Sequence, residues 1–174
     1  MRPRHKLSRV VFFAVVALCL AQAWFYASRL PERVASHFGP SGLPNAWMER
    51  GRFLGFYLGV VAVMALVFLG LASKFASFEG SEMNLPNKDY WLAPARRAET
   101  LEFMSGAFLR FGAGTLALLL EVFHQVFEFN LGRTNALAHP LLSLVVYAVF
   151  TAAWVAAFFL RFSYAAGPKG PGKR

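Results

Sequence analysis

The chain is dominated by four long apolar stretches that are separated by more polar segments. The stretches are Val10–Ala27, Phe53–Ala72, Phe103–Val126 and Leu141–Leu160, and the second and fourth contain no charged residue. A helix that crosses the hydrocarbon core of a bilayer needs about 20 mostly apolar residues. A surface helix of a soluble protein instead shows a polar face to water. The pattern therefore predicts an all-α integral membrane protein, a four-helix bundle made of two transmembrane hairpins.

Turn-forming residues fill the connections between these stretches. The first connection, residues 28–52, contains Gly39-Pro40 and Ser41-Gly42, which are typical of turns. We expect a first hairpin over residues 10–72 and a second over residues 94–164, within a single domain of residues 1–174. Pro94 and Pro140 are placed to begin helices, because proline is favoured in the first helical turn. The Gly/Pro-rich basic tail, residues 165–174, is predicted to be disordered.

Basic residues are distributed unevenly between the two sides of the predicted bundle. The net charge is +9, and cytoplasmic loops of membrane proteins collect Lys and Arg. We therefore interpret the charge as a sign of topology and expect no nucleic-acid partner. Both termini and the second connection, residues 73–100, are predicted to be cytoplasmic. The basic residues on that side are Arg2, Arg4, Lys6, Arg9, Lys74, Lys88, Arg96, Arg97, Arg161, Lys169, Lys173 and Arg174, against Arg29, Arg33, Arg50, Arg52 and Arg133 in the first and third connections.

The N-terminal segment also resembles a signal peptide. Basic residues up to Arg9 precede an apolar run and Ala21-Gln22-Ala23, which is the order of a cleavable signal. The run continues, however, through Trp24, Phe25 and Tyr26, and such aromatic residues suit a membrane interface. We therefore expect the first helix, and with it residues 1–23, to be retained.

Small residues recur at spacings of four in two of the predicted helices. They are Gly51, Gly55 and Gly59 in the second and Ala148, Ala152 and Ala156 in the fourth. Small residues on one stripe let helices approach closely in lipid. We interpret the stripes as contacts between helices of one chain, with the seam of a homodimer as the alternative.

The third apolar stretch is unusual because it carries ionisable residues. The residues of this polar stripe are Arg110, Glu121, His124 and Gln125, with Glu128 just beyond. At about 100° per residue, Arg110, Glu121 and Glu128 lie within about 20° of one another on the helix. Ionisable groups at membrane depth are costly and usually face the bundle interior or a wet cavity. The stripe is a candidate functional site.

Several interpretations of the stripe are open. It can lock the helices together as a satisfied polar patch, or it can carry protons or ions through Glu121 and His124. Glu121-x-x-His124 is also half of a di-iron site, but the other three spans contain no Glu to complete it. A zinc site of His37, His124, Glu128 and His139 on the outer side is a further hypothesis, although the spacing fits no compact motif.

Motifs of known enzymes are missing from the sequence. It has no Walker loop, no dinucleotide fingerprint, no His-Glu-x-x-His and no Gly-x-Ser-x-Gly. Cys19 is the single cysteine, so neither a disulfide nor a cysteine-based zinc site is available. We predict no catalytic residue, no cofactor and no metal, and therefore a protein that is not an enzyme.

The first connection resembles a known family. It contains, in this order, Leu30-Pro31, His37-Phe38, Gly42 and a final Trp47. This order is similar to the signature of a bacterial membrane domain of unknown function, number 1648, which also begins SdpI-type immunity proteins. The resemblance covers residues 10–72 and implies a bacterial cell-membrane protein with an informative outer loop and no assigned reaction. We interpret the loop as a structural cap, or as a surface that recognises a peptide, a lipid or a partner protein.

The second connection refines this resemblance. Its residues Tyr90-Trp91, Pro94 and Arg96-Arg97 are similar to those of shorter stand-alone members and unlike those of the longer SdpI-type chains. They are a candidate cytoplasmic site.

Taken together, these patterns predict a non-enzymatic binding or accessory protein of the bacterial inner membrane that senses or protects. The alternative is a small proton- or ion-coupled transporter that uses the polar stripe, and the third hypothesis is a lipid-modifying enzyme. The expected partners are the lipid bilayer, a membrane protein or peptide, and a second copy of the chain.

Overall fold

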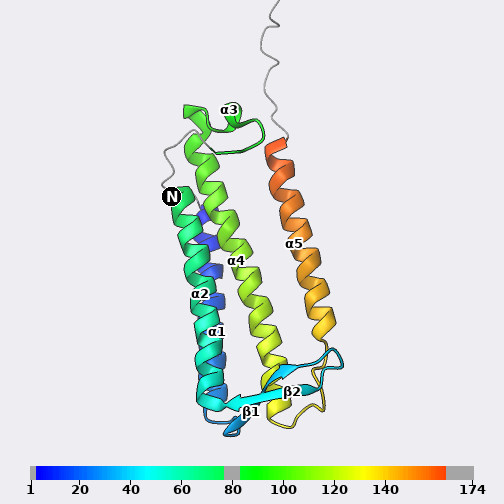
Figure 1. Ribbon diagram of the computed structural model, residues 1–174. Coiled ribbons are helices and arrows are strands. Elements are labelled where there is room, and N and C mark those ends of the chain that lie inside the picture. Colours follow the sequence, from blue (N-terminus) through cyan, green and yellow to red (C-terminus); the bar gives the residue numbers. More distant parts are fainter. Residues whose placement is uncertain (1–2, 77–82, 164–174) are drawn as a thin grey trace, which may run out of the picture.

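Four long helices lie side by side and form the body of the molecule (Figure 1). The computed structural model describes residues 3–76 and 83–163. The long helices are α1 (Pro3–Ala27), α2 (Arg50–Ala76), α4 (Pro94–Asn130) and α5 (Pro140–Ser163). Each is long and apolar enough to cross a membrane. The predicted all-α membrane bundle with four spans is confirmed, and the chain is a multi-pass membrane protein. The tail, residues 165–174, lies outside the described residues.

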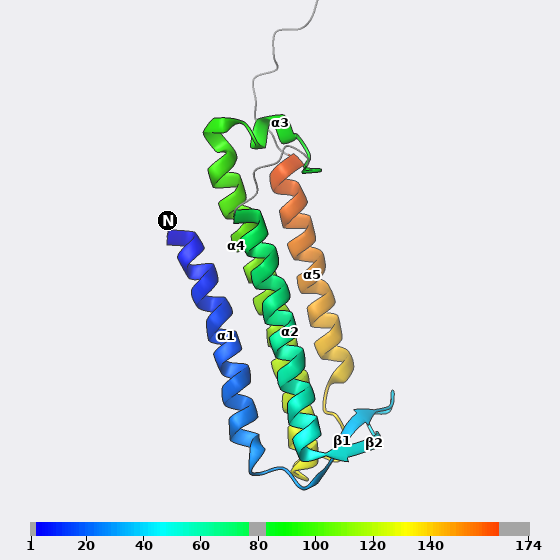
Figure 2. The same ribbon diagram turned by 60° about the vertical axis from the view of Figure 1, so that its left-hand side comes forward.

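Helix α4 is the central element of the bundle. It is 37 residues long, which corresponds to about 55 Å, and it packs against α1, α2 and α5. Figure 2 shows α2 lying along α4, with α1 and α5 on opposite sides. The apolar window of α4 is the most buried of the four, whereas no residue in that of α5 is fully buried in the chain alone. A lipid-facing α5 is the consequence.

The ends of α4 show why the sequence begins and ends a helix there. Pro94 lies in its first turn, and Pro140 likewise opens α5, as predicted. Gly132 follows the last residues of α4 with a positive φ of 70°. The backbone N–H groups of Gly132 and Arg133 donate to the carbonyls of Phe129 and Glu128, which is a Schellman motif. The helix therefore extends to Asn130, four residues beyond the predicted stretch.

A β-hairpin occupies the first connection, where the sequence predicted only turns. Strands β1 (Arg33–Phe38) and β2 (Pro44–Glu49) pair antiparallel, and Ala35 lies opposite Trp47. The second strand was not predicted because it contains Pro44, but proline is tolerated as the first residue of an edge strand. The short helix α3 (Lys88–Trp91) lies at the opposite end of the bundle (Figure 1). These two ends are named the hairpin end and the α3 end.

Close helix packing occurs at glycines other than those predicted. A Cβ added to Gly55 or Gly59 would meet no atom within 4 Å, and Ala148, Ala152 and Ala156 are exposed. The prediction that these two stripes pack within the chain is therefore wrong; both face the surroundings of the bundle. The close contacts are made by α4 instead. A Cβ at Gly112 would lie 2.5 Å from Phe68 of α2, and one at Gly114 would overlap Phe150 of α5.

Candidate functional site

The polar stripe of α4 is directed mainly toward α1. Near the α3 end, Arg110 donates a hydrogen bond to the hydroxyl of Ser8 at 2.9 Å. Near the hairpin end, the Tyr26 hydroxyl lies 2.7 Å from Glu128 Oε1, to which it donates, and 3.2 Å from His124 Nδ1. Arg110 and Glu128 thus form hydrogen bonds to α1 at the two ends of the α1–α4 interface, and Glu121 lies between them along α4.

Tyr26 organises the hairpin end of this interface. Its ring stacks on Phe127 at 4.5 Å, while its hydroxyl joins His124 and Glu128. Glu128 also forms an ion pair with Arg133 at 2.8 Å, so its charge is balanced. Tyr26 was not predicted to belong to the site, although it lies at the aromatic end of the first apolar stretch.

Glu121 does not pair with His124. Its Oε1 accepts a hydrogen bond of 2.6 Å from Gln125 Nε2. In the part of the chain that the structure describes, no lysine or arginine forms an ion pair with Glu121. Glu121 is therefore a carboxylate in a membrane-spanning helix whose charge is unbalanced, which is a costly arrangement.

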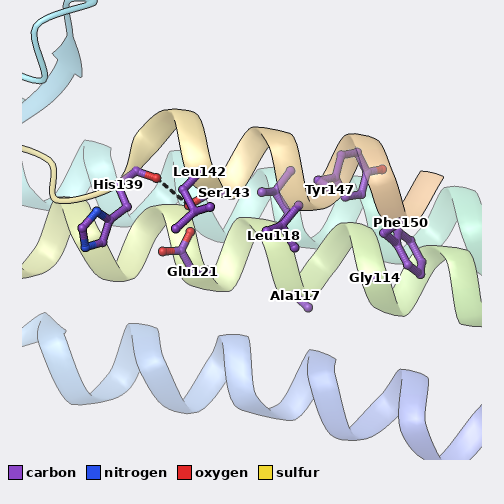
Figure 3. Close-up of a pocket in the computed structure, with 10 residues that line it drawn as sticks. Gly114, Ala117, Leu118, Glu121, His139, Leu142, Ser143, Tyr147 and Phe150 are labelled. Atoms are coloured by element: carbon purple, nitrogen blue, oxygen red, sulfur yellow. Dashed lines mark hydrogen bonds between the residues drawn. The ribbon is translucent and has the colours of Figure 1, made fainter. Parts of the chain in front are cut away.

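Gln125 fixes Glu121 to the start of α5. Its side chain is buried, donates to Ser143 Oγ at 3.0 Å and accepts from the backbone N–H of His139 at 2.9 Å. Ser143 in turn donates to the His139 carbonyl at 3.0 Å (Figure 3). The sequence placed Gln125 on the polar stripe, but the structure turns it toward α5. The amide holds the carboxylate of Glu121 in one orientation.

An apolar groove runs between α4 and α5, and Glu121 forms part of its wall. Its volume is about 450 Å³. In Figure 3 its lining residues come from facing turns of α4 and α5 and from His139 just before α5. The lining residues are Gly114, Ala117, Leu118, Glu121, His139, Leu142, Ser143, Val146, Tyr147 and Phe150. Glu121 is the only carboxylate among them. We name this space the α4–α5 groove.

Gly114 and Tyr147 shape the far end of the α4–α5 groove. Phe150 lies so close to Gly114 that no side chain fits between them. The Tyr147 and Thr115 hydroxyls are 2.8 Å apart and hydrogen-bonded. Two aromatic rings thus line this end of the groove, and the carboxylate lies toward its other end.

A second hollow lies between α1 and α4 and shares Ala117 and Glu121 with the groove. Its volume is about 590 Å³, and we name it the α1–α4 hollow. Gln22 lines it and is held by two hydrogen bonds: it donates to the Leu120 carbonyl at 2.9 Å and accepts from the Tyr57 hydroxyl at 2.7 Å. Gln22 and Tyr57 were not predicted as site residues, although an amide within an apolar span is a signal visible in the sequence.

The outer-loop candidates divide into two groups. Leu30 is buried, and its carbonyl accepts from Arg50 at 2.9 Å. Phe38 packs edge-on against Phe129 with ring centroids 5.1 Å apart. The Gly42 carbonyl accepts from the backbone N–H of Leu137 at 3.0 Å. These residues attach the hairpin to the helices.

The remaining outer-loop candidates are exposed. They are Pro31, His37 and Trp47; half of the Trp47 side chain is accessible. His37 Nδ1 lies 2.5 Å from Asn45 Oδ1 across the hairpin. These residues are accessible in the chain alone, and they lie away from the polar stripe.

The second-connection candidates surround α3. Arg96 lies over the ring of Tyr90, and Trp91 donates to the Phe162 carbonyl of α5 at 3.1 Å. Pro94 begins α4, and Arg97 is half-buried in its first turn. The structure therefore brings these residues together at the end of the bundle opposite to His37 and Trp47.

The zinc hypothesis is not supported by the geometry. Within residues 3–76 and 83–163, no three or more His, Cys, Asp or Glu side chains gather closely enough to hold a metal ion. His124 and Glu128 meet at Tyr26, but His37 pairs with Asn45. Cys19 is buried and free.

Comparison with protein families identifies the first hairpin. Residues 13–68 match the family described as Domain of unknown function (DUF1648), which confirms the resemblance that the sequence of the first hairpin indicated. The match includes most of α1, the β-hairpin and most of α2, and it ends before α4 and the α4–α5 groove. Searches of curated proteins and of solved structures gave no match.

Proposed function

We propose that the protein is a non-enzymatic binding protein of the membrane that takes an apolar ligand with a positively charged or hydrogen-bond-donating head into the α4–α5 groove. One observation carries the proposal. Glu121 is a carboxylate that no cation of the described chain balances, and it stands in a groove whose other walls are mostly apolar. Binding sites of this kind combine apolar walls with few, well-placed polar groups.

The contacts of Glu121 favour binding over catalysis. Gln125 holds Oε1, which leaves the second oxygen to accept from a ligand. Ser143, the hydroxyl nearest to this network, already donates to a backbone carbonyl. A serine nucleophile would instead need a base that accepts its proton. The arrangement supports a fixed acceptor for a ligand.

The position of the groove supports entry from the lipid. Glu121 and Ala117 are exposed in the chain alone, and α1 and α5 stand on opposite sides of α4 (Figure 2). A ligand that partitions into the bilayer would reach this face by lateral diffusion. We propose the bacterial inner membrane as its location, with both termini cytoplasmic, because of the distribution of Lys and Arg.

A sensing or protective role follows if ligand binding is passed to the hairpin. Gln125 contacts the backbone N–H of His139, and Leu137, two residues earlier, donates to Gly42 of the hairpin turn. The groove and the outer hairpin are therefore connected through the short segment between α4 and α5. A membrane protein or a peptide that meets His37 and Trp47 is the partner that we propose for the exposed face of the hairpin.

The binding proposal is tested with a matched pair of amphiphiles. The full chain in phosphatidylcholine nanodiscs is titrated with dodecylamine and with dodecanoate, and the melting temperature is recorded. We expect the amine, and not the carboxylate, to raise the melting temperature of the wild type. Glu121→Gln should lose this rise, whereas Glu128→Gln should retain it, because Glu128 lies at Tyr26 outside the groove.

A steric variant supplies the control for the groove itself. Ala117→Phe should fill the space beside Glu121 and lower the rise, whereas Ala148→Phe, on the exposed face of α5, should leave it intact. An amine effect that is equal in the wild type and in Glu121→Gln would contradict the proposal.

Proton-coupled transport is a second candidate because Glu121 lines both hollows. The α1–α4 hollow contains Glu121 and His124, and His124 continues through Tyr26 to Glu128. A relay requires Glu121 to gain and lose a proton. Proton flux into dye-loaded liposomes under an imposed potential should then be abolished by Glu121→Gln with the fold preserved. Unchanged flux in that variant would exclude the relay.

A further inference from the structure

The C-terminal end of α5 is capped by neutral side chains from the second connection. Asn87 Nδ2 donates to the carbonyls of Phe162 and Ser163 at 3.0 and 3.2 Å, and Trp91 Nε1 donates to Phe162 at 3.1 Å. The last carbonyls of a helix have no partner within the helix and often attract a cation. Here an amide and an indole satisfy them, so the charge of Arg161 is free for another use.

Two arginines at this end rest on aromatic rings. Arg161 Cζ lies 3.9 Å from the ring centroid of Phe103 and 5.6 Å from that of Trp91. Arg96 Cζ lies 3.7 Å from the ring of Tyr90. The Tyr90 and Trp91 rings meet edge to face at 5.1 Å. These five residues, Tyr90, Trp91, Arg96, Phe103 and Arg161, form one continuous cluster, the α3 cluster.

The guanidinium groups of the α3 cluster have no anionic partner in residues 3–76 and 83–163. The Nε atoms of Arg96 and Arg161 are buried without a hydrogen bond, and no ion pair within these residues includes either side chain. A guanidinium that stacks on a ring uses its face, so its two terminal NH2 groups can still donate in its plane although Nε is buried. Partly buried charge is costly unless it is paired. The cluster therefore favours a bound anion.

We propose that the α3 cluster binds the phosphate group of an anionic membrane lipid. Phosphate oxygens match the fork of the arginine N–H groups. Aromatic rings at the end of a membrane helix lie at headgroup depth, which is where a lipid phosphate is found. The basic residues Lys74, Lys88 and Arg97 belong to the same connection and would attract an anionic leaflet. This site is independent of the α4–α5 groove.

The experiment compares a lipid with the free anion that shares its chemistry. The full chain in detergent is mixed with dioctanoylphosphatidylglycerol, dioctanoylphosphatidylcholine or inorganic phosphate, and the melting temperature is measured. We expect a rise of several degrees with the anionic lipid alone. An equal rise with inorganic phosphate at the same concentration would assign the site to free phosphate and overturn the lipid.

Variants locate the effect. Arg161→Gln and Arg96→Gln should each lose most of the rise, and Arg161→Lys should regain only part of it, because lysine keeps the charge without the planar fork. Arg33→Gln removes an exposed arginine at the hairpin end and should keep the full rise. A full rise in both glutamine variants, or an equal loss in Arg33→Gln, would overturn the proposal. If Arg161→Gln does not fold, Arg96→Gln decides by the same criterion.

Discussion

The side-chain amide of Asn130 pairs with the backbone of Ala35 through both of its polar atoms. Asn130 Oδ1 accepts from the Ala35 N–H at 2.7 Å, and Nδ2 donates to the Ala35 carbonyl at 3.0 Å. Asn130 thus occupies the place of a neighbouring strand beside β1. Because Asn130 is the last residue of α4, this pair fixes the hairpin to the end of the central helix.

Asn130→Leu should therefore destabilise the protein more than an ordinary surface change. The substitution removes both hydrogen bonds to Ala35 and a third to the Val126 carbonyl. It leaves the buried N–H of Ala35 without a partner, and the loss costs about 2–4 kcal/mol in total. Thermal or denaturant unfolding in detergent measures the loss. Asn135→Leu, an exposed asparagine in the next connection, is the control and should change stability by about 0.5 kcal/mol or less. Equal effects of the two would mean that the Asn130 pair is not formed.

The glycines of α4 should be sensitive to substitution, and those of α2 should not. A Cβ at Gly112 would lie 2.5 Å from the Phe68 side chain, so Gly112→Ala should force a shift that costs about 1–3 kcal/mol. Gly55→Ala and Gly59→Ala enter open space and should be neutral or slightly stabilising, because alanine favours helices. Melting temperatures of the three variants are compared. A loss at Gly59 together with a smaller apparent mass would indicate a dimer seam instead.

Much of the fold could be predicted from hydrophobicity because lipid imposes a simple rule. Uninterrupted apolar stretches such as Phe53–Ala72 leave few alternatives to a spanning helix, and Pro94 and Pro140 marked helix starts correctly. The β-hairpin was missed because its strands are short and Pro44 stands in one of them. The packing of the two small-residue stripes, in α2 and α5, was predicted wrongly. The spacing of the residues shows only that they share one face of a helix, and the position of the neighbouring helix determines whether that face is buried.

The candidate site could be predicted in part. A polar residue in an apolar span is visible in the sequence, and Glu121, His124 and Glu128 were found in this way. Their partners depend on how α4 rotates against α1 and α5, which the sequence of one helix does not determine. Gln125 therefore turned out to hold Glu121 toward α5, while Tyr26, from a span 98 residues away, contacts His124.

Membrane orientation gives a direct prediction from charge. The Lys and Arg residues concentrate in the termini and the second connection, so these parts should be cytoplasmic. Reporter fusions after Asn45, Lys88, Asn135 and Lys173 should report out, in, out and in. An external signal at Lys88 would reverse the assignment of the hairpin end to the outer side. Mass spectrometry of the purified protein should find residues 1–23 retained.

Two glycines with positive φ, one in the β-hairpin turn and one after α4, distinguish the cost of backbone strain from the cost of a steric contact. Gly42 and Gly132 both have a positive φ, 76° and 70°, which alanine adopts only at a cost of about 1–2 kcal/mol. A Cβ at Gly132 would meet nothing within 4 Å, whereas one at Gly42 would lie 3.3 Å from the Leu137 carbonyl oxygen. Gly132→Ala should therefore show the cost of strain alone.

Gly42→Ala should show that cost and also disturb the contact between the hairpin and the segment before α5. We expect the larger loss of stability at Gly42, measured by thermal unfolding. Because that segment leads through Leu137 to His139 and Gln125, Gly42→Ala should also weaken the dodecylamine effect at Glu121, and Gly132→Ala should not. Equal amine responses in the two variants would mean that the hairpin and the α4–α5 groove act independently.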